Sequence, residues 1–289
     1  MQRKDKKIYE FNQSPFYCLQ SKKKLAKLLF ITYKKLQYLT SSQNLYLTGN
    51  RVCSNGKLRH LEKPIKTLKI IQKRIKNLLD RIKIPNYIFN LSKGKSHIDN
   101  GRLHFSNSVM MRLDIKKYFP STSSKRVYRF FRNRMKCSPD VAGILVSLLT
   151  YKGHLPTGSP HSPILSYFAN IEMWESIDKI MADTNCTISV WVDDITISGD
   201  KIPENTKLSI KQAIKSNGFK YHKEKHYKEE DAKEVTGIII SNNQLKSPNR
   251  HHLKKYTLKN SIQKQTDSKQ KYLLSRKLQG LEAHMKRVV

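Results

Sequence analysis

Apolar residues recur at intervals of three and four over several segments of the chain, which is the spacing of an amphipathic helix. In the segment 68–82, Lys and Arg fill the face opposite the apolar positions. Pro163 suits the first turn of another helix, because a proline there loses no helical hydrogen bond. The pattern predicts helices over 23–39, 68–82, 124–135, 139–150, from about 162 to 181, and 204–217.

Shorter segments alternate apolar and polar residues and predict strands. Asn55 and Gly56 separate two such runs in the segment 44–64, which indicates a β-hairpin. Further strands are expected over 109–119, 219–228 and 233–241, and helix again after residue 241. Helices mixed with these short strands predict an α+β fold with a small antiparallel sheet.

Two aspartates interrupt the alternation in the segment "SVWVDDITISGD", residues 189–200. Adjacent charges are unfavourable inside a strand, because each must stay hydrated and the two repel each other. A hairpin with Asp193 and Asp194 at its turn accommodates them and directs the two carboxylates to opposite faces. Taken alone, the pair favours an ordinary acidic turn on the surface over a functional site.

Composition narrows the choice of partners. The 289 residues include 56 Lys and Arg against 22 Asp and Glu, a net charge of +34, which favours a polyanion such as nucleic acid. This length predicts two or three lobes rather than one unit. The cysteines have no paired spacing, and the longest apolar stretch, 141–149, is too short to span a membrane. A cytoplasmic protein without membrane contact is expected.

The acids also fit a specific chemistry. Asp114 ends a predicted strand, a Gly- and Pro-rich loop precedes the helix near residue 162, and Asp193 and Asp194 follow on a hairpin. Carboxylates on neighbouring strands are the ligands that two Mg²⁺ ions need for phosphoryl transfer. Clustered acids would repel nucleic acid in so basic a protein unless metal ions neutralised them.

The motifs resemble those of reverse transcriptases, and most closely those of the retron group. "RLDIKKYFPS" (112–121) resembles the first metal-binding motif, "LPTGSPHSP" (155–163) the template-and-nucleotide loop, and "WVDD" the YxDD motif. "VTG" (235–237) and "NGRLH" (100–104) resemble two retron-type patterns. The resemblance extends over roughly residues 25–285, and no nuclease, protease or integrase segment is expected.

The resemblance implies roles for individual residues near the chemistry. It makes Asp114, Asp193 and Asp194 the ligands of two Mg²⁺ ions, although Asp114 alone could be a strand-end cap. Phe119 corresponds to the bulky residue that excludes a ribose 2′-hydroxyl, and Lys225 to a lysine that protonates departing pyrophosphate. The remaining substrate-binding candidates are Lys57, Arg59, Thr157, Gly158 and Trp191.

Other residues correspond to family positions that contact nucleic acid. Asn100 and His104 are assigned either to RNA binding or to positioning, and the segment 275–287 resembles a helix that follows the duplex. The nucleic-acid candidates are Asn100, His104, Val235, Thr236, Gly237, Arg276, Lys277, Lys286 and Arg287. The chain departs from the family pattern at Trp191, Thr157 and Gly101, where Tyr, Gln and Ala are usual.

The implied architecture is a right-hand polymerase. It divides the chain into a basic helical region (1–43), fingers (44–108), a palm (109–241, with finger-like helices at 124–150) and a short thumb (242–289). The implied activity is Mg²⁺-dependent copying of the protein's own structured non-coding RNA, with deoxynucleotides as substrates. The product is single-stranded DNA linked to that RNA, primed from a guanosine 2′-hydroxyl.

The resemblance also implies an anti-phage role with a separately encoded effector or toxin. Two alternatives stay open. One is another bacterial reverse transcriptase, of the group II intron type or of a defence group outside the retrons. The other is a catalytically silent RNA-binding subunit, for which the charge of +34 would suffice.

Overall fold

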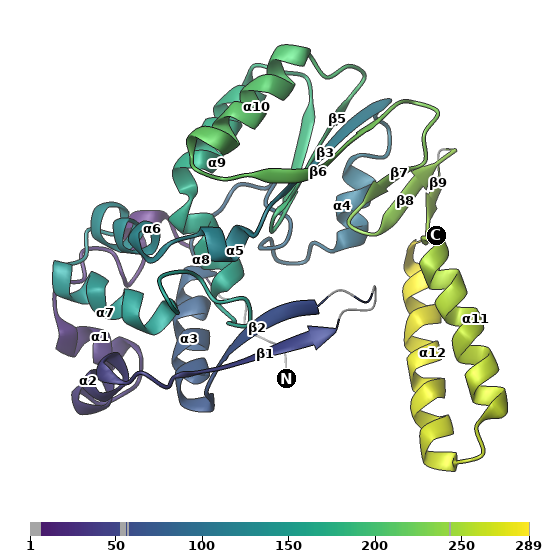
Figure 1. The fold of residues 1–289 in the computed structure, drawn as a ribbon. Coiled ribbons are helices and arrows are strands. Elements are labelled where there is room, and N and C mark those ends of the chain that lie inside the picture. Colours follow the sequence, from purple (N-terminus) through teal and green to yellow (C-terminus); the bar gives the residue numbers. More distant parts are fainter. Residues whose placement is uncertain (1–6, 53–55, 57, 243, 289) are drawn as a thin grey trace. The chain divides into compact units, whose positions relative to one another are not determined.

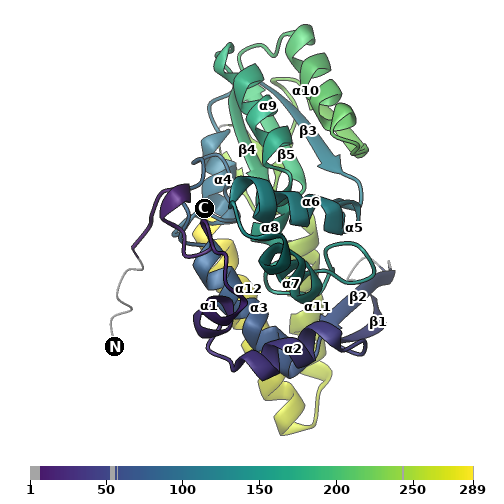
Figure 2. The same ribbon diagram turned by 90° about the vertical axis from the view of Figure 1, so that its left-hand side faces the viewer.

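A computed structural model describes residues 7–52, 56, 58–242 and 244–288. Its contacts divide the chain into two units, and each unit combines segments that are distant in sequence. Unit 1 comprises residues 1–85, 115–178 and 213–220, and unit 2 comprises 86–114, 179–212 and 221–289. Figures 1 and 2 show the elements from two directions, and each unit is described below by itself.

Unit 1 is mainly helical and contains one hairpin. Its elements are η1 (Phe11–Gln13), α1 (Lys22–Leu28), α2 (Tyr33–Ser41), β1 (Tyr46–Val52), β2 (Leu58–Pro64), α3 (Lys66–Leu79), α5 (Tyr118–Ser121), α6 (Ser124–Arg129), η2 (Phe130–Arg134), α7 (Pro139–Leu149), α8 (Ser162–Ala169) and most of α9 (Ile171–Ala182). The hairpin expected over 44–64 is confirmed as the antiparallel pair β1 and β2. The buried side chains of α3, α7 and α8 form much of its core.

The single helix expected over 23–39 is wrong, because the chain forms α1 and α2 there. Phe30 has a φ of 57°, a left-handed backbone conformation that ends a helix. Thr32 then caps α2, since its side chain accepts a hydrogen bond from Lys35 N. The apolar period continues through the break, so periodicity alone could not reveal it.

Unit 2 contains a four-stranded sheet with the order β4-β5-β3-β6, in which β5 pairs antiparallel with both β4 and β3. The strands are β3 (Val109–Ile115), β4 (Thr187–Trp191), β5 (Asp194–Gly199) and β6 (Tyr221–Tyr227), and α10 (Glu204–Ser216) connects β5 to β6. The strand expected to end near Asp114 is confirmed. The central strands β3 and β5 bury Met111, Leu113, Ile195 and Ile197.

A second sheet in unit 2 consists of β7 (Lys233–Val235), β8 (Ile238–Ser241) and β9 (Gln244–Lys246). The single strand expected over 233–241 is therefore wrong. Thr236 and Gly237 have φ angles of 46° and 82°, so they form a two-residue turn with positive φ at both positions. The helix α4 (His97–Leu103) packs against β7 and β8.

The helices α11 (Asn249–Lys264) and α12 (Ser268–Val288) follow β9, as expected for a helical end of the chain. They lie side by side as a helical hairpin (Figure 1). Val288 at the end of α12 packs with Ile98 of α4 and Ile238 of β8. This small apolar cluster joins the hairpin to the second sheet.

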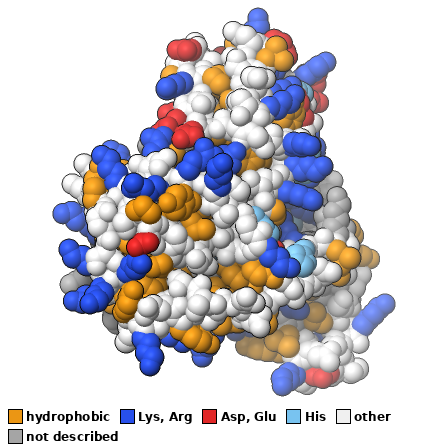
Figure 3. Space-filling view, turned by 60° about the vertical axis from the view of Figure 1, so that its left-hand side comes forward, with side chains coloured by type: hydrophobic (Ala, Val, Ile, Leu, Met, Phe, Trp, Pro, Cys, Tyr) orange, Lys and Arg blue, Asp and Glu red, His pale blue; other side chains and the backbone are white. Residues whose placement is uncertain are grey.

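Basic side chains dominate the polar surface. Figure 3 shows many Lys and Arg side chains and few acidic ones on the face that it presents. None of the helices in the described part of the chain is both long enough and apolar enough to cross a membrane.

Candidate active site

The three predicted metal ligands come together at one end of the four-stranded sheet of unit 2. Asp114 on β3 pairs directly with Asp194 on β5, and Trp191 on β4 pairs with Asp194 on the other side. The turn between β4 and β5 therefore consists of Val192 and Asp193, one residue earlier than expected. Pairing register thus places Asp114 beside Asp194, which comes 80 positions later in the sequence (194 − 114).

The turn that carries Asp193 has an unusual backbone. Val192 has a φ of 62°, a value that a β-branched residue rarely adopts and that glycine usually supplies at this turn position. Asn90 supports the turn, because its Oδ1 accepts a hydrogen bond of 3.0 Å from Val192 N. Val190 adds backbone hydrogen bonds with Tyr87 and Phe89. Strain of this kind persists only where the surroundings hold the backbone in place, and it is frequent at functional sites.

Burial and the neighbouring carboxylates disfavour negative charge on Asp193 and Asp194. Burial, together with the charges of Asp114 and Asp194, raises the pKa of Asp193 to about 6. Burial also raises the pKa of Asp194, which the neighbouring Arg112 guanidinium partly offsets. A cation that binds beside these carboxylates therefore stabilises their charged form.

Two basic side chains already lie against the carboxylates. Lys223 Nζ is 2.6 Å from Asp114 Oδ2, and Arg112 Nη2 is 3.3 Å from Asp194 Oδ1. His222 Nδ1 lies 3.3 Å from Asp114 Oδ1 without hydrogen-bond geometry. The sequence did not single out Lys223, Arg112, His222 or Asn90, because their roles depend on strand register and backbone geometry.

The donor set suits a hard divalent cation, because all three acids offer carboxylate oxygens. In the described part of the chain, however, no group of three or more His, Cys, Asp or Glu side chains is arranged to hold a metal ion. The carboxylates of Asp114 and Asp194 are instead engaged in ion pairs. The residues fit the expected ion in chemistry, and Lys223 and Arg112 are the cations that such an ion would meet beside these carboxylates.

Lys225, the predicted proton donor, lies on the same strand as Lys223. Its side chain is exposed, and among the described residues it has no hydrogen bond or ion pair in this structure. Lys223 reaches Asp114 because its φ of 55° interrupts the regular alternation of β6. The role of Lys225 stays a prediction about the protein with nucleotide bound.

His104 and Asn100 are buried inside unit 2. The His104 ring nitrogens lie 2.6 and 2.7 Å from the hydroxyls of Ser198 and Ser189, so the ring joins β5 to β4 behind the acids. Burial lowers the pKa of His104 to about 4, which keeps the ring neutral. These contacts favour the positioning role over contact with RNA for His104.

Asn100 belongs to a contact between α4 and the turn of the second sheet. Its Nδ2 donates to Thr236 Oγ1 over 3.3 Å, and Thr236 Oγ1 donates to the His97 carbonyl over 3.1 Å. Gly101 leaves room for Ile238, since a Cβ there would lie 3.0 Å from Ile238 Cγ2. The "NGRLH" and "VTG" segments therefore pack together, and the glycine at 101 has a steric reason.

Three nucleic-acid candidates line one pocket of about 450 Å³ in unit 2: Thr236, Gly237 and Lys277. Arg250 and Lys254 of α11 contribute further positive charge, and His97 stacks on His284 with ring centroids 5.0 Å apart. Trp191 contacts the other side of this group, edge-on to His97 at 6.4 Å. Val235, also a candidate, is fully buried beneath the turn.

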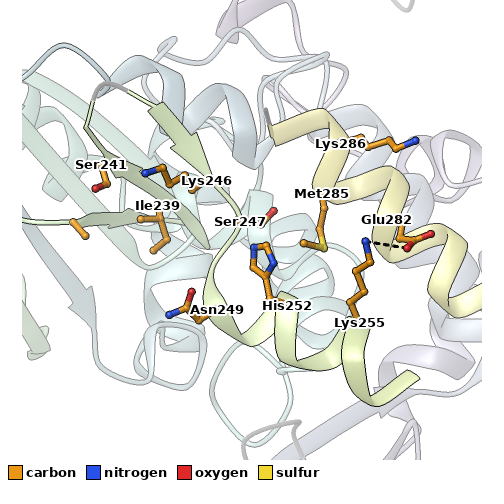
Figure 4. Close-up of a pocket in the computed structure, with 11 residues that line it drawn as sticks. Ile239, Ser241, Lys246, Ser247, Asn249, His252, Lys255, Glu282, Met285 and Lys286 are labelled. Atoms are coloured by element: carbon orange, nitrogen blue, oxygen red, sulfur yellow. Dashed lines mark ion pairs between the residues drawn. The ribbon is translucent and has the colours of Figure 1, made fainter. Parts of the chain in front are cut away.

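The remaining candidates on α12 are exposed: Arg276, Lys286 and Arg287. Lys286 lines a different pocket, of about 1030 Å³, between β8, β9 and the helical hairpin. Figure 4 shows that pocket with the Lys255–Glu282 ion pair, which joins α11 to α12 over 3.0 Å. The structure thus distributes the predicted phosphate contacts over more than one side of α12.

In unit 1, the "LPTGSP" loop is fixed to the hairpin strand β2. The buried Glu62 carboxylate accepts hydrogen bonds from His154 Nε2 at 3.0 Å and Thr157 N at 3.2 Å. Thr157 Oγ1 donates to the His60 carbonyl over 2.9 Å. A Cβ at Gly158 would lie only 2.6 Å from the Glu62 carbonyl oxygen, so this position requires glycine. No sequence pattern indicated a role for Glu62 or His154.

Three further residues that were predicted to bind the substrate belong to the segments of unit 1. Phe119 is half-buried on α5, with its ring 6.1 Å from Tyr118. Arg59 is exposed on β2, where it pairs with Arg51. Lys57 lies outside the described residues.

Comparison with known proteins gives a consistent result. The reverse transcriptase (RNA-dependent DNA polymerase) family matches residues 49–240. The retron Se72 reverse transcriptase of Salmonella heidelberg is 33% identical over 197 residues, covering 66% of this chain and 50% of the relative. The retron Ec86 reverse transcriptase of Escherichia coli is 22% identical over 232 residues, covering 77% of this chain and 71% of the relative.

A third relative, the retron Mx162 reverse transcriptase of Myxococcus xanthus, is 22% identical over 262 residues and covers 77% of this chain and 54% of the relative. The chain thus spans about half the length of two of these three curated relatives. The matched region includes β3 and the β4–β5 hairpin with all three acids. The recognition of a retron-type sequence is confirmed, and the chain belongs to the reverse transcriptase family.

Proposed function

We propose that this protein is a retron-type RNA-directed DNA polymerase. The observation that supports this most strongly is the convergence of Asp114, Asp193 and Asp194 at one end of the β4-β5-β3-β6 sheet. A catalytically silent RNA-binding subunit has no need to cluster three acids when burial disfavours the charged form of Asp193 and Asp194. The matches to retron reverse transcriptases support the same choice over other bacterial groups.

The right-hand division is part of the proposal. We assign residues 44–108 to the fingers, 109–241 to the palm and 242–289 to the thumb, after a basic helical region. Asp114, Asp193 and Asp194 would hold two Mg²⁺ ions, which when bound activate the primer hydroxyl and neutralise the departing pyrophosphate. The chain's own groups then orient these carboxylates: Asn90 fixes the turn, and His104 joins the two strands beneath it.

The substrate contacts are assigned in the same way. Phe119 excludes the ribose 2′-hydroxyl, Lys57 and Arg59 bind the triphosphate, and Thr157 and Gly158 shape the nucleotide loop. Trp191 presents an aromatic face to the primer end, and Lys225 protonates pyrophosphate. Thr236, Gly237 and Lys277 line a basic pocket that suits a nucleic-acid phosphate. Arg276, Lys286 and Arg287 supply further phosphate contacts.

The proposed template is the protein's own structured non-coding RNA. Synthesis begins from a guanosine 2′-hydroxyl and yields single-stranded DNA joined to that RNA, in an anti-phage system that includes a separately encoded effector. The support for this part is the resemblance to retron reverse transcriptases, and the net charge of +34 suits an RNA partner.

A primer-extension assay tests the activity. Purified protein should extend a DNA primer on an RNA template with deoxynucleotides and Mg²⁺, and Asp193→Asn should reduce incorporation by roughly 10²–10³-fold. This substitution keeps the side-chain volume and removes one carboxylate charge. Extension by the variant at a rate near that of the unmodified protein would contradict the proposal.

A further inference from the structure

Two basic side chains neutralise the acid cluster, and they are held very differently. Arg112 is 15% exposed, and its Nη1 also donates to the Glu234 carbonyl over 2.7 Å, which anchors the guanidinium between β3 and β7. Lys223 is 59% exposed, and among the described residues Asp114 is the partner that holds its Nζ. Arg112 is therefore a fixed part of the site, whereas the ammonium of Lys223 can leave for water at little cost.

The backbone of β6 places Lys223 in this position. Its φ of 55° is in the left-handed region, which is unfavourable for a residue with a Cβ. Without that conformation, successive side chains of β6 would alternate regularly between the two faces of the sheet. The neighbouring Glu224 forms an ion pair with Lys211 of α10 over 2.5 Å, which fixes the strand just beyond the irregular residue.

The contact occupies a carboxylate that a divalent cation would use. Lys223 Nζ is 2.6 Å from Asp114 Oδ2, so a divalent cation that binds this carboxylate is repelled by the ammonium charge beside it. The Asp114 side chain is only 16% exposed, which leaves little room for both.

We propose that Lys223 is a tethered cation that occupies the Asp114 carboxylate in the metal-free protein and must withdraw when a divalent cation binds. The inference rests on the proposed function, because it assumes that these acids bind such a cation. Lys223 then has two effects. It stabilises the acid cluster before the ion arrives, and it raises the ion concentration at which the site fills.

Binding of Mn²⁺, followed by electron paramagnetic resonance of the free ion, tests this without any enzymatic readout. Lys223→Gln keeps most of the side-chain length and removes the charge, so the variant should bind Mn²⁺ roughly three- to tenfold more tightly than the unmodified protein. Lys223→Arg retains a cation and should stay near the unmodified affinity. Lys228→Gln is the matched control, because it removes the same charge just after β6 from an exposed residue.

A thermal-shift measurement provides a second readout. In EDTA, Lys223→Gln should melt at a lower temperature than Lys228→Gln, since only the first variant removes the cation paired with Asp114. Saturating Mn²⁺ should remove this difference.

Two outcomes would overturn the inference, and they differ in their meaning. Equal Mn²⁺ affinities for Lys223→Gln and Lys228→Gln would contradict the role of Lys223 and leave the proposed function intact. If the unmodified protein bound no Mn²⁺, or if Asp114→Asn left its Mn²⁺ binding unchanged, the acids would not be a divalent-cation site. That result would contradict both the role of Lys223 and the proposed function.

Discussion

The "LPTGSP" loop of unit 1 and the acid hairpin of unit 2 are both family motifs, yet they are stabilised in opposite ways. The loop is anchored by the buried Glu62 carboxylate and fits closely against β2 at Gly158. The hairpin carries Asp193, Asp194 and a backbone outlier at Val192, and Asp114 on the neighbouring strand β3 holds the exposed counter-ion Lys223. The loop is therefore stable as it stands, whereas the acid cluster would be stabilised further if a divalent cation replaced Lys223.

This difference predicts which substitutions reduce mainly the stability of the protein and which reduce mainly its activity. Changes in the hairpin should reduce activity much more than stability, because the present contacts there are unfavourable or replaceable. Changes in the loop should reduce stability, since its hydrogen bonds and packing leave no alternative arrangement. The predictions below run from the largest expected effect to the smallest.

Asp114→Asn should produce the largest loss. It removes one of the three clustered carboxylates, on the residue that faces Asp194 in the sheet register, so DNA synthesis should fall by roughly 10²–10³-fold in extension assays. Circular dichroism should show an unchanged fold, because an isosteric amide relieves repulsion within the cluster. A loss of activity accompanied by global unfolding would contradict the contrast between the two regions.

Asp193 should give the metal-free protein a specific pH dependence. Because its pKa is raised to about 6, the folded state binds a proton more tightly than the unfolded state does. Stability should therefore fall as pH rises from about 4 to about 6, by at most roughly 3 kcal/mol, and then level off.

The difference between urea unfolding curves of the unmodified protein and Asp193→Asn, recorded in EDTA, isolates this contribution. The expected result is a difference that grows in favour of the variant up to about pH 6. A difference independent of pH would show that Asp193 titrates normally.

The positions of both motifs could be predicted from the sequence, but the contacts that stabilise them could not, because those contacts depend on tertiary structure. The alternation around Asp114 and the interruption at Asp193 located the strands and the hairpin, because short-range patterns determine them. Lys223 could not be preferred over Lys225, since the choice depends on one left-handed residue within β6. Glu62 and His154 are 92 positions apart, and tertiary packing alone brings them together.

Gly158→Ala should mainly affect stability. The new Cβ would lie 2.6 Å from the Glu62 carbonyl oxygen, so backbone must shift and unfolding free energy should fall by roughly 1–3 kcal/mol. Gly143→Ala in α7 is the matched control, because nothing lies within 4 Å of its Cβ position. That control should stabilise the helix by about 0.5–1 kcal/mol. Equal urea midpoints for the two variants would show that the loop does not fit closely.

Glu62→Gln should have the smallest effect. One amide oxygen replaces the two carboxylate oxygens that accept from His154 and Thr157, so stability should decrease by about 1 kcal/mol. Because the loop then moves more freely, the KM for deoxynucleotides should rise more than kcat falls. Glu175→Gln, which loses only an exposed ion pair with Arg134, should change neither quantity measurably.

The central claim is that Asp114, Asp193 and Asp194 hold divalent cations once Lys223 has withdrawn. A crystal structure of the protein grown with Mn²⁺, with anomalous diffraction recorded at the manganese edge, tests it most directly. The account predicts an anomalous peak within coordination distance of these carboxylates, with Lys223 Nζ no longer against Asp114. Manganese bound elsewhere, or bound at the acids while Lys223 keeps its contact with Asp114, would contradict it.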